Sequence, residues 1–218
     1  MMHLTYNRRN VLGDGCAEPA NGGISDLGRA AIAEMNRTGV IVDVAHSGWQ
    51  TSLEAAKASS KPVVASHSGA VEVYKHIRSK PDPTIRAIAD SGGYVGVYSV
   101  ASFLGRSEDL NAMIDHIEHL VKRFGADHVA IGTDIAYIPR RIEAEYRKMG
   151  RSPKARARYE AFWPAGASDS KSHPSLAWTN WPMFTAGMVQ RGISDTDIQK
   201  ILGGNVMRVA RAALPNGA

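Results

Sequence analysis

Cysteine is almost absent from this sequence, with one residue in 218, and aromatic side chains make up 7% of the chain. A single cysteine excludes an internal disulfide framework and a cysteine-rich zinc cluster. No apolar run approaches the roughly 18 residues of a membrane-spanning helix, and the first residues lack the apolar segment of a signal peptide. We therefore expect a soluble globular protein with no membrane span and, by default, a cytoplasmic location.

The excess of positive charge comes from one segment. Residues 140–158 hold eight Lys or Arg and two Glu, so the rest of the chain has 18 basic and 19 acidic residues. A nucleic-acid-binding protein with a uniformly basic surface would not leave this remainder near neutral. We expect no nucleic-acid partner and interpret residues 140–176 as a basic insertion, a loop-helix segment within a single domain of residues 1–218.

Short β-branched runs alternate with helical patterns along the chain. Among the helical patterns, Ser25 and Gly39 have the residue types expected just before and just after a helix, and a second apolar stripe fills residues 107–124. Such βαβ alternation predicts a parallel sheet with right-handed crossovers. The strand candidates are residues 2–6, 40–46, 61–67, 93–100 and 128–134.

Two architectures fit this alternation, an open doubly wound sheet and a TIM-type barrel. No glycine-rich dinucleotide fingerprint follows the first strand, which weakens the doubly wound sheet. Polar residues end three of the strands (His46, His67 and Asp134), as in barrels, where sites lie at the carboxyl ends of strands. The sequence therefore predicts an α/β fold, a TIM-type barrel that is incomplete. It has about five of the eight βα units, and the N-terminal strands are missing.

His46 and His67 each end an apolar strand, and one helix separates them. Strands joined in this way are parallel and usually adjacent, so their carboxyl ends lie at the same face. Alternation places His46 on the same side as Val42 and Val44, and Asp43 on the opposite side. Two converging imidazoles favour a divalent metal site, and the alternative is a pair of hydrogen-bonded structural histidines.

Three further side chains could take part in chemistry. Asp134 could ligate a metal, act as a general base or orient a water, or it could cap a helix. Arg78 could hold a carboxylate through two parallel hydrogen bonds, or be a solvated loop charge. Tyr6 could donate its hydroxyl to a developing oxyanion, or simply line the barrel. The pair His116 and Glu118 lies within an amphipathic helix, and we expect it at the surface.

Several motifs in series resemble the renal (membrane) dipeptidase family of zinc peptidases, and their order and spacing agree over nearly the whole chain. The resemblance implies an amidohydrolase-like barrel with two zinc ions bridged by a glutamate. It also implies hydrolysis of dipeptides, often with tolerance of a D-residue at the C-terminal position. The motifs are LTYNRRNVLGDGCAEP, GVIVDVAHSG, PVVASHSGA, IGTD, HPSLAWTNWP and ILGGNVMRV.

The resemblance assigns roles position by position. His46 and His67 match the two histidines on the second zinc, and Arg78 matches the arginine that holds the substrate carboxylate. Asp134 matches the aspartate that handles the proton near the bridging water. Tyr6 stands where many members have a histidine that contacts the substrate carbonyl.

The His-x-Asp motif and the bridging glutamate that open the family's pattern have no match, so the chain resembles the C-terminal portion of a dipeptidase. At most the second zinc site is represented. We therefore expect impaired activity from the isolated chain, with self-association or a need for a complementing N-terminal segment. The alternatives are a non-catalytic binding or assembly module derived from the same barrel, and another amidohydrolase-type hydrolase that acts on cyclic amides.

Overall fold

Five parallel strands form one sheet in the computed structural model, which describes residues 1–105, 107–135, 173–177 and 179–214. The strands follow one another across the sheet in chain order, and each coincides with one of the ranges predicted from the sequence, although β3 extends one residue beyond its range, to Ser68. They are β1 (Met2–His3), β2 (Val42–Asp43), β3 (Val63–Ser68), β4 (Val95–Val97) and β5 (Val129–Ile131).

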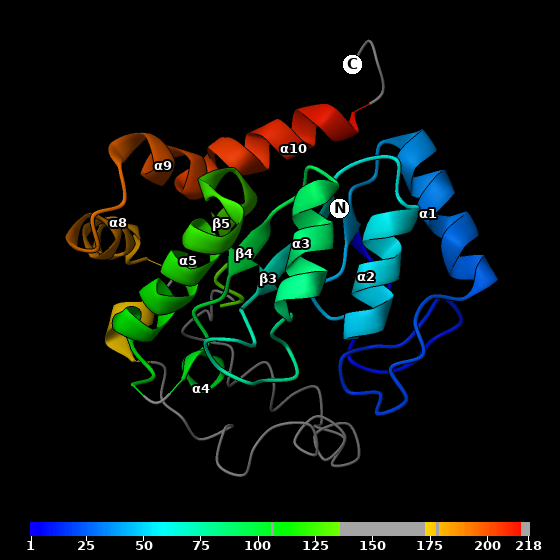
Figure 1. The fold of residues 1–218 in the computed structure, drawn as a ribbon, viewed down its shortest axis with the longest axis horizontal. Coiled ribbons are helices and arrows are strands. Elements are labelled where there is room, and N and C mark those ends of the chain that lie inside the picture. Colours follow the sequence, from blue (N-terminus) through cyan, green and yellow to red (C-terminus); the bar gives the residue numbers. More distant parts are fainter. Residues whose placement is uncertain (106, 136–172, 178, 215–218) are drawn as a thin grey trace, which may run out of the picture.

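Helices connect successive strands and stand side by side over one face of the sheet (Figure 1). These are α1 (Asp26–Thr38), α2 (Trp49–Ala58), α3 (Asp82–Asp90), α4 (Ala101–Leu104) and α5 (Leu110–Phe124). A short turn, η1 (Ala126–His128), leads from α5 into β5. The chain after the last strand forms α8 (Trp181–Gln190), α9 (Asp195–Gln199) and α10 (Asn205–Ala213), together with the short helical segments η2 (Pro174–Leu176) and η3 (Lys200–Gly204).

The strand order distinguishes between the two architectures. A doubly wound sheet reverses its strand order at a switch point and carries helices on both faces. Here the order runs from β1 to β5 without reversal, and the connecting helices cover one face. The prediction of an incomplete barrel is confirmed. Residues 140–172 of the predicted basic insertion lie outside the described residues.

Local sequence signals set the ends of the helices. The Ser25 hydroxyl accepts a hydrogen bond from the Gly28 N–H at 3.0 Å, which satisfies one of the free donors at the start of α1. Gly39 ends the same helix with a φ of 76°, a conformation that favours glycine. Helix α5 begins at Leu110 rather than at residue 107, because Asp109 is the residue that caps it.

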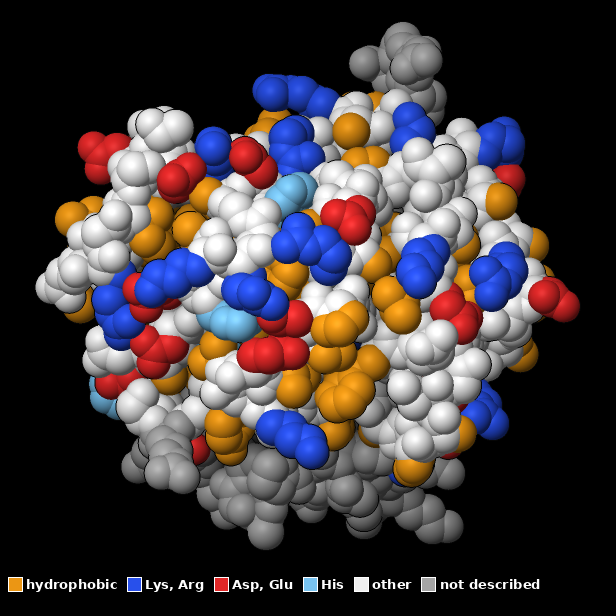
Figure 2. All heavy atoms as spheres, viewed as in Figure 1, with side chains coloured by type: hydrophobic (Ala, Val, Ile, Leu, Met, Phe, Trp, Pro, Cys, Tyr) orange, Lys and Arg blue, Asp and Glu red, His pale blue; other side chains and the backbone are white. Residues whose placement is uncertain are grey.

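The core fills the space between the sheet and its helices. Side chains such as Val63, Ile88 and Ile117 are fully buried in one apolar cluster. On the outer, helical face, Figure 2 shows Lys and Arg side chains interspersed with Asp and Glu. Within the described part of the chain, no helix combines the length and the apolar character needed to cross a bilayer.

His116 is fully buried, so the expectation of a surface position for it was wrong. Its Nδ1 accepts the Ala70 N–H at 3.0 Å, and its Nε2 donates to the Leu104 carbonyl oxygen at 3.0 Å. The imidazole thus connects α5 to the loop that follows β3 and to the last residue of α4. A polar residue on the inner face of this helix satisfies backbone groups that apolar side chains would leave unpaired.

We expect His116 to make the protein less stable in mild acid. Burial lowers the pKa of His116 from 6.5 to about 4. Between these values the unfolded chain binds a proton that the folded chain rejects, so the free energy of unfolding falls as the pH drops, by up to about 3 kcal/mol for this group. His116→Gln keeps a donor and an acceptor but does not titrate. Chemical denaturation at pH 7 and pH 4.5 should show a smaller loss in this variant, and equal losses would contradict the assignment.

Candidate metal and substrate site

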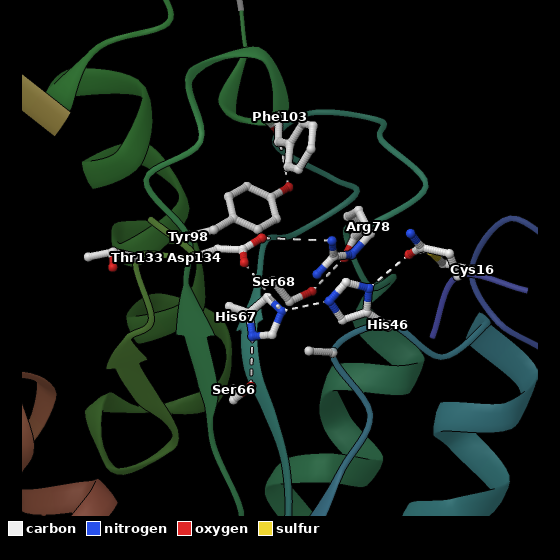
Figure 3. Close-up of polar contacts among 12 residues, drawn as sticks. Cys16, His46, Ser66, His67, Ser68, Arg78, Tyr98, Phe103, Thr133 and Asp134 are labelled. Atoms are coloured by element: carbon white, nitrogen blue, oxygen red, sulfur yellow. Dashed lines mark hydrogen bonds and ion pairs between the residues drawn. The ribbon is translucent and has the colours of Figure 1, made fainter. Parts of the chain in front are cut away.

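The two predicted metal ligands meet at the carboxyl ends of β2 and β3. Their Nε2 atoms lie 2.9 Å apart, and the ring centroids are separated by 4.9 Å (Figure 3). His67 lies on β3, whereas His46 lies in the turn three residues beyond the end of β2. The sequence thus predicted the meeting of the two histidines correctly, although β2 is too short for strand alternation to be the cause.

The other nitrogen of each imidazole is already engaged. The His46 Nδ1 donates to the Asn7 side-chain oxygen at 2.8 Å, and the His67 Nδ1 lies 2.8 Å from the Ser66 hydroxyl, which itself donates to Asp43. Both Nε2 atoms therefore carry lone pairs that face each other. Two bare lone pairs at this distance repel unless a cation lies between them, so the pair fits a metal ion.

The electrostatic surroundings keep these imidazoles neutral, which is the form that binds metals. Burial, assisted by the nearby Arg78 charge, lowers the pKa of His46 to about 2. Burial also lowers the pKa of His67, and the carboxylate of Asp134 opposes this shift.

Asp43 belongs to the site, although alternation placed it on the opposite side from His46. It is 2% exposed and accepts the Ser66 N–H at 3.1 Å as well as the Ser66 hydroxyl. The prediction failed because β2 ends at Asp43, so the two-residue period does not continue to His46. Asp43 orients His67 through Ser66.

His3 is the residue that sequence reasoning missed. It lies on β1, paired in register with Asp43 on β2, and its ring centroid is 5.1 Å from that of His46 and 5.5 Å from that of His67. One ligand atom from each of the three histidines lies within 4.8 Å of the others. Only the register between β1 and β2 places His3 beside the other two histidines, and this register cannot be read from the sequence.

Arg78 is 1% exposed, which excludes the alternative of a solvated loop charge. Its Nη1 lies 3.8 Å from a carboxylate oxygen of Asp134, and the other Asp134 oxygen lies 3.7 Å from the His67 Nε2. The Nε and Nη2 atoms of Arg78 are buried and have no hydrogen-bond partner among the described residues. A buried cation with unpaired donors is costly unless an anionic ligand binds it.

Tyr6 covers one side of the histidine pair. Its ring stacks on that of His46 with centroids 4.2 Å apart, and the residue remains 52% exposed. Burial of the hydroxyl raises the pKa of Tyr6, so the phenol keeps its proton. Tyr6 can therefore donate a hydrogen bond beside the metal ligands.

Two residues next to the site, the buried Lys80 and the half-buried Cys16, were not singled out as functional from the sequence. Lys80 is fully buried, and its Nζ donates to the Ser47 carbonyl oxygen at 2.5 Å; burial lowers the pKa of Lys80 to about 7. The Cys16 thiol donates to the Asn7 side-chain oxygen at 3.3 Å, and burial raises its pKa. A raised pKa keeps this thiol protonated, and a protonated thiol is a weak nucleophile.

The fold and the site define a partial (β/α) barrel with histidines and a buried arginine gathered at the carboxyl ends of its parallel strands. Residues 1–147 match the model of the membrane dipeptidase family, peptidase family M19. The chain therefore belongs to the membrane dipeptidase family, as the motifs in its sequence predicted.

Curated relatives agree with this membership. The chain is 27% identical over 213 residues to the dipeptidase tcpJ of Claviceps purpurea, a match that covers 95% of this chain and 43% of that protein. It is 28% identical over 209 residues to the dipeptidase verJ of Clonostachys rogersoniana, covering 94% of this chain and 46% of that protein. The chain thus spans less than half the length of these relatives.

Solved structures show the same fold. An amidohydrolase from Pseudomonas aeruginosa superposes with a TM-score of 0.74 at 30% identity, covering 97% of this chain and 63% of the other. The probable dipeptidase PvdM from Pseudomonas aeruginosa superposes with a TM-score of 0.74 at 21% identity, covering 98% of this chain and 62% of the other. These matches confirm the barrel architecture.

Proposed function

We propose that this protein is a zinc-dependent dipeptidase whose Arg78 holds the C-terminal carboxylate of the substrate. The observation that carries the proposal is the buried Arg78 guanidinium, two of whose nitrogens have no partner among the described residues. A carboxylate accepts two parallel hydrogen bonds from such a group. The guanidinium is linked to the histidine pair by Asp134, which lies within 3.8 Å of both Arg78 and His67.

The residues around the histidine pair and Asp134 have different roles in the proposed reaction. A zinc ion held by His46 and His67 would polarise the peptide carbonyl and activate a water. Asp134 accepts the proton of the attacking water at its carboxylate and passes it to the leaving amine. Tyr6 donates its phenol hydrogen to the oxyanion that develops on the carbonyl oxygen.

The substrate class can be narrowed further. A metallopeptidase from Rhodobacter sphaeroides with the same fold, at a TM-score of 0.72, is liganded with a phosphinate mimic of the dipeptide L-Ala-D-Ala. We extend this ligand class to the present site, including a D-residue at the C-terminal position. Because the chain contains at most one of the family's two zinc sites, we propose that its activity in isolation is impaired.

The test measures binding and turnover on the 218-residue chain. With zinc, we expect the chain to bind the phosphinate mimic of L-Ala-D-Ala and to hydrolyse dipeptides slowly. Both properties should vanish in His46→Ala and His67→Ala and persist in His173→Ala, which alters an exposed histidine.

A dipeptide amide and a cyclic amide serve as the matched substrates, because both lack the carboxylate that Arg78 would hold. The dipeptidase proposal is contradicted if the zinc-loaded chain binds no mimic, or if it cleaves either amide as well as the free dipeptide.

A further inference from the structure

We propose that His3 completes a three-histidine zinc site with His46 and His67, so that this chain alone holds one zinc ion tightly. The inference rests on the proposed function for the presence of a metal at this point, and it adds a ligand to that site. The family resemblance assigns His46 and His67 but not His3. The evidence for His3 is its position and its surroundings.

The distances suit a single ion. Zinc bound to imidazole nitrogens at about 2.0–2.1 Å in a tetrahedral site separates those nitrogens by about 3.3 Å. The His46 and His67 nitrogens are 2.9 Å apart, and no pair among the three ligand atoms is separated by more than 4.8 Å. The His46–His67 separation is a few tenths of an ångström short of this value and the other two are at most 4.8 Å, so small side-chain rotations would bring all three nitrogens onto one ion.

The backbone holds the three histidines on neighbouring elements. His3 comes from β1, His46 from the turn after β2 and His67 from β3, and these three strands are adjacent and parallel in the sheet. A site built on such a scaffold keeps its ligands in place before the metal arrives, which favours tight binding.

Asp43 supplies the outer contact that metal-ligating histidines usually have. The Nδ1 of His3 is buried, has no hydrogen-bond partner among the described residues, and lies 3.3 Å from a carboxylate oxygen of Asp43. The same carboxylate reaches His67 through Ser66. A carboxylate behind a ligating imidazole fixes the ring and raises its basicity. Its negative charge also offsets the positive charges of the zinc ion and Arg78.

The fourth position of the ion then remains for water or substrate. Catalytic zinc sites commonly have three protein ligands and keep one position open. Asp134 lies 3.7 Å from the His67 Nε2 and 3.8 Å from Arg78, so a substrate whose carboxylate is held by Arg78 would lie beside the histidines that hold the ion.

The test measures zinc binding on the purified 218-residue chain, without reference to activity. Titration against a chromophoric chelator should give one zinc per chain, and X-ray absorption should report three imidazole ligands. His3→Ala should reduce the imidazole count to two and weaken zinc binding at least about 100-fold, since loss of even an outer partner costs about 10- to 100-fold. The matched control is His173→Ala, and His3→Asn provides a second variant closer in size. Thermal unfolding without zinc verifies that each variant folds.

Two imidazoles in the parent chain, or an affinity of His3→Ala within about threefold of the parent, would overturn the inference. Absence of zinc binding by the parent would overturn it as well. A three-imidazole site that binds no dipeptide mimic would support His3 and contradict the dipeptidase proposal. Binding of the mimic at a two-imidazole site would support the dipeptidase proposal and contradict the role of His3. The two proposals can therefore fail independently.

Discussion

Replacing Arg78 with methionine is expected to weaken binding of the dipeptide mimic more than 100-fold and, at the same time, to stabilise the fold. The loss of a charged, two-point hydrogen bond to a carboxylate costs about 3 kcal/mol or more. The same guanidinium is 1% exposed, and two of its nitrogens have no hydrogen-bond partner among the residues that the structure describes. Removing a buried group of this kind relieves a desolvation cost of about 1–3 kcal/mol.

Weaker binding of the mimic together with a higher free energy of unfolding would distinguish a binding role of Arg78 from a structural role. Removal of a structural arginine would lower the free energy of unfolding. Removal of an arginine whose donors are used only by a bound anion would raise it. The measurements are urea denaturation and calorimetric binding of the mimic in the presence of zinc. Arg37→Met is the matched control, because Arg37 is exposed and pairs with Glu34 on the surface of α1. The assignment fails if Arg78→Met binds the mimic as the parent does, or unfolds more readily.

Replacing Gly132 with alanine is expected to destabilise the protein by about 3 kcal/mol or more, or to prevent folding, as overpacking of a rigid backbone does. A Cβ at Gly132 would lie 1.8 Å from the Ser66 carbonyl oxygen, and one at Gly96 would lie 2.1 Å from the same atom. Rotation of a side chain cannot relieve either clash, because the Ser66 carbonyl oxygen is a backbone atom. Relief would move Ser66 and, with it, the neighbouring His67.

A second glycine gives the matched control for this prediction. Gly204 has helical dihedral angles, and a Cβ there would first meet the Gln199 carbonyl oxygen at 3.3 Å. Gly204→Ala should therefore change the free energy of unfolding by no more than about 1 kcal/mol, since alanine favours a helix by about that amount. The free energies of unfolding of the two variants, measured by denaturant titration, should differ by about 2 kcal/mol or more. Equal stabilities would mean that β5 does not approach β3 as closely as described.

Much of the candidate site could be predicted because its residues follow strands. The apolar runs before His46 and His67 predicted two parallel strands, and parallel strands joined by one helix bring their carboxyl ends together. Asp134 was predicted by the same reasoning from the final strand. In the structure the His67 Nε2 lies 2.9 Å from the His46 Nε2 and 3.7 Å from an oxygen of Asp134.

Other parts of the site could not be predicted from local pattern. Asp43 was placed on the opposite side because a strand was assumed to continue where β2 ends. His3 had no visible partner until the register paired it with Asp43. His116 was expected at the surface because its helix is amphipathic. It is buried instead, and its ring nitrogens form hydrogen bonds with the backbone of Ala70 and Leu104.

The sequence by itself determined the α/β class, the five strands, the family and the functional residues near the carboxyl ends of the strands, because these depend on local periodicity and on motifs in series. Only the tertiary structure decided that Arg78 is a buried cation, two of whose nitrogens find no partner in the described part of the chain, and that three histidines surround one point. Burial and register are properties of the packed sheet. They depend on which residues of distant segments lie opposite one another, and no window of the sequence contains that information.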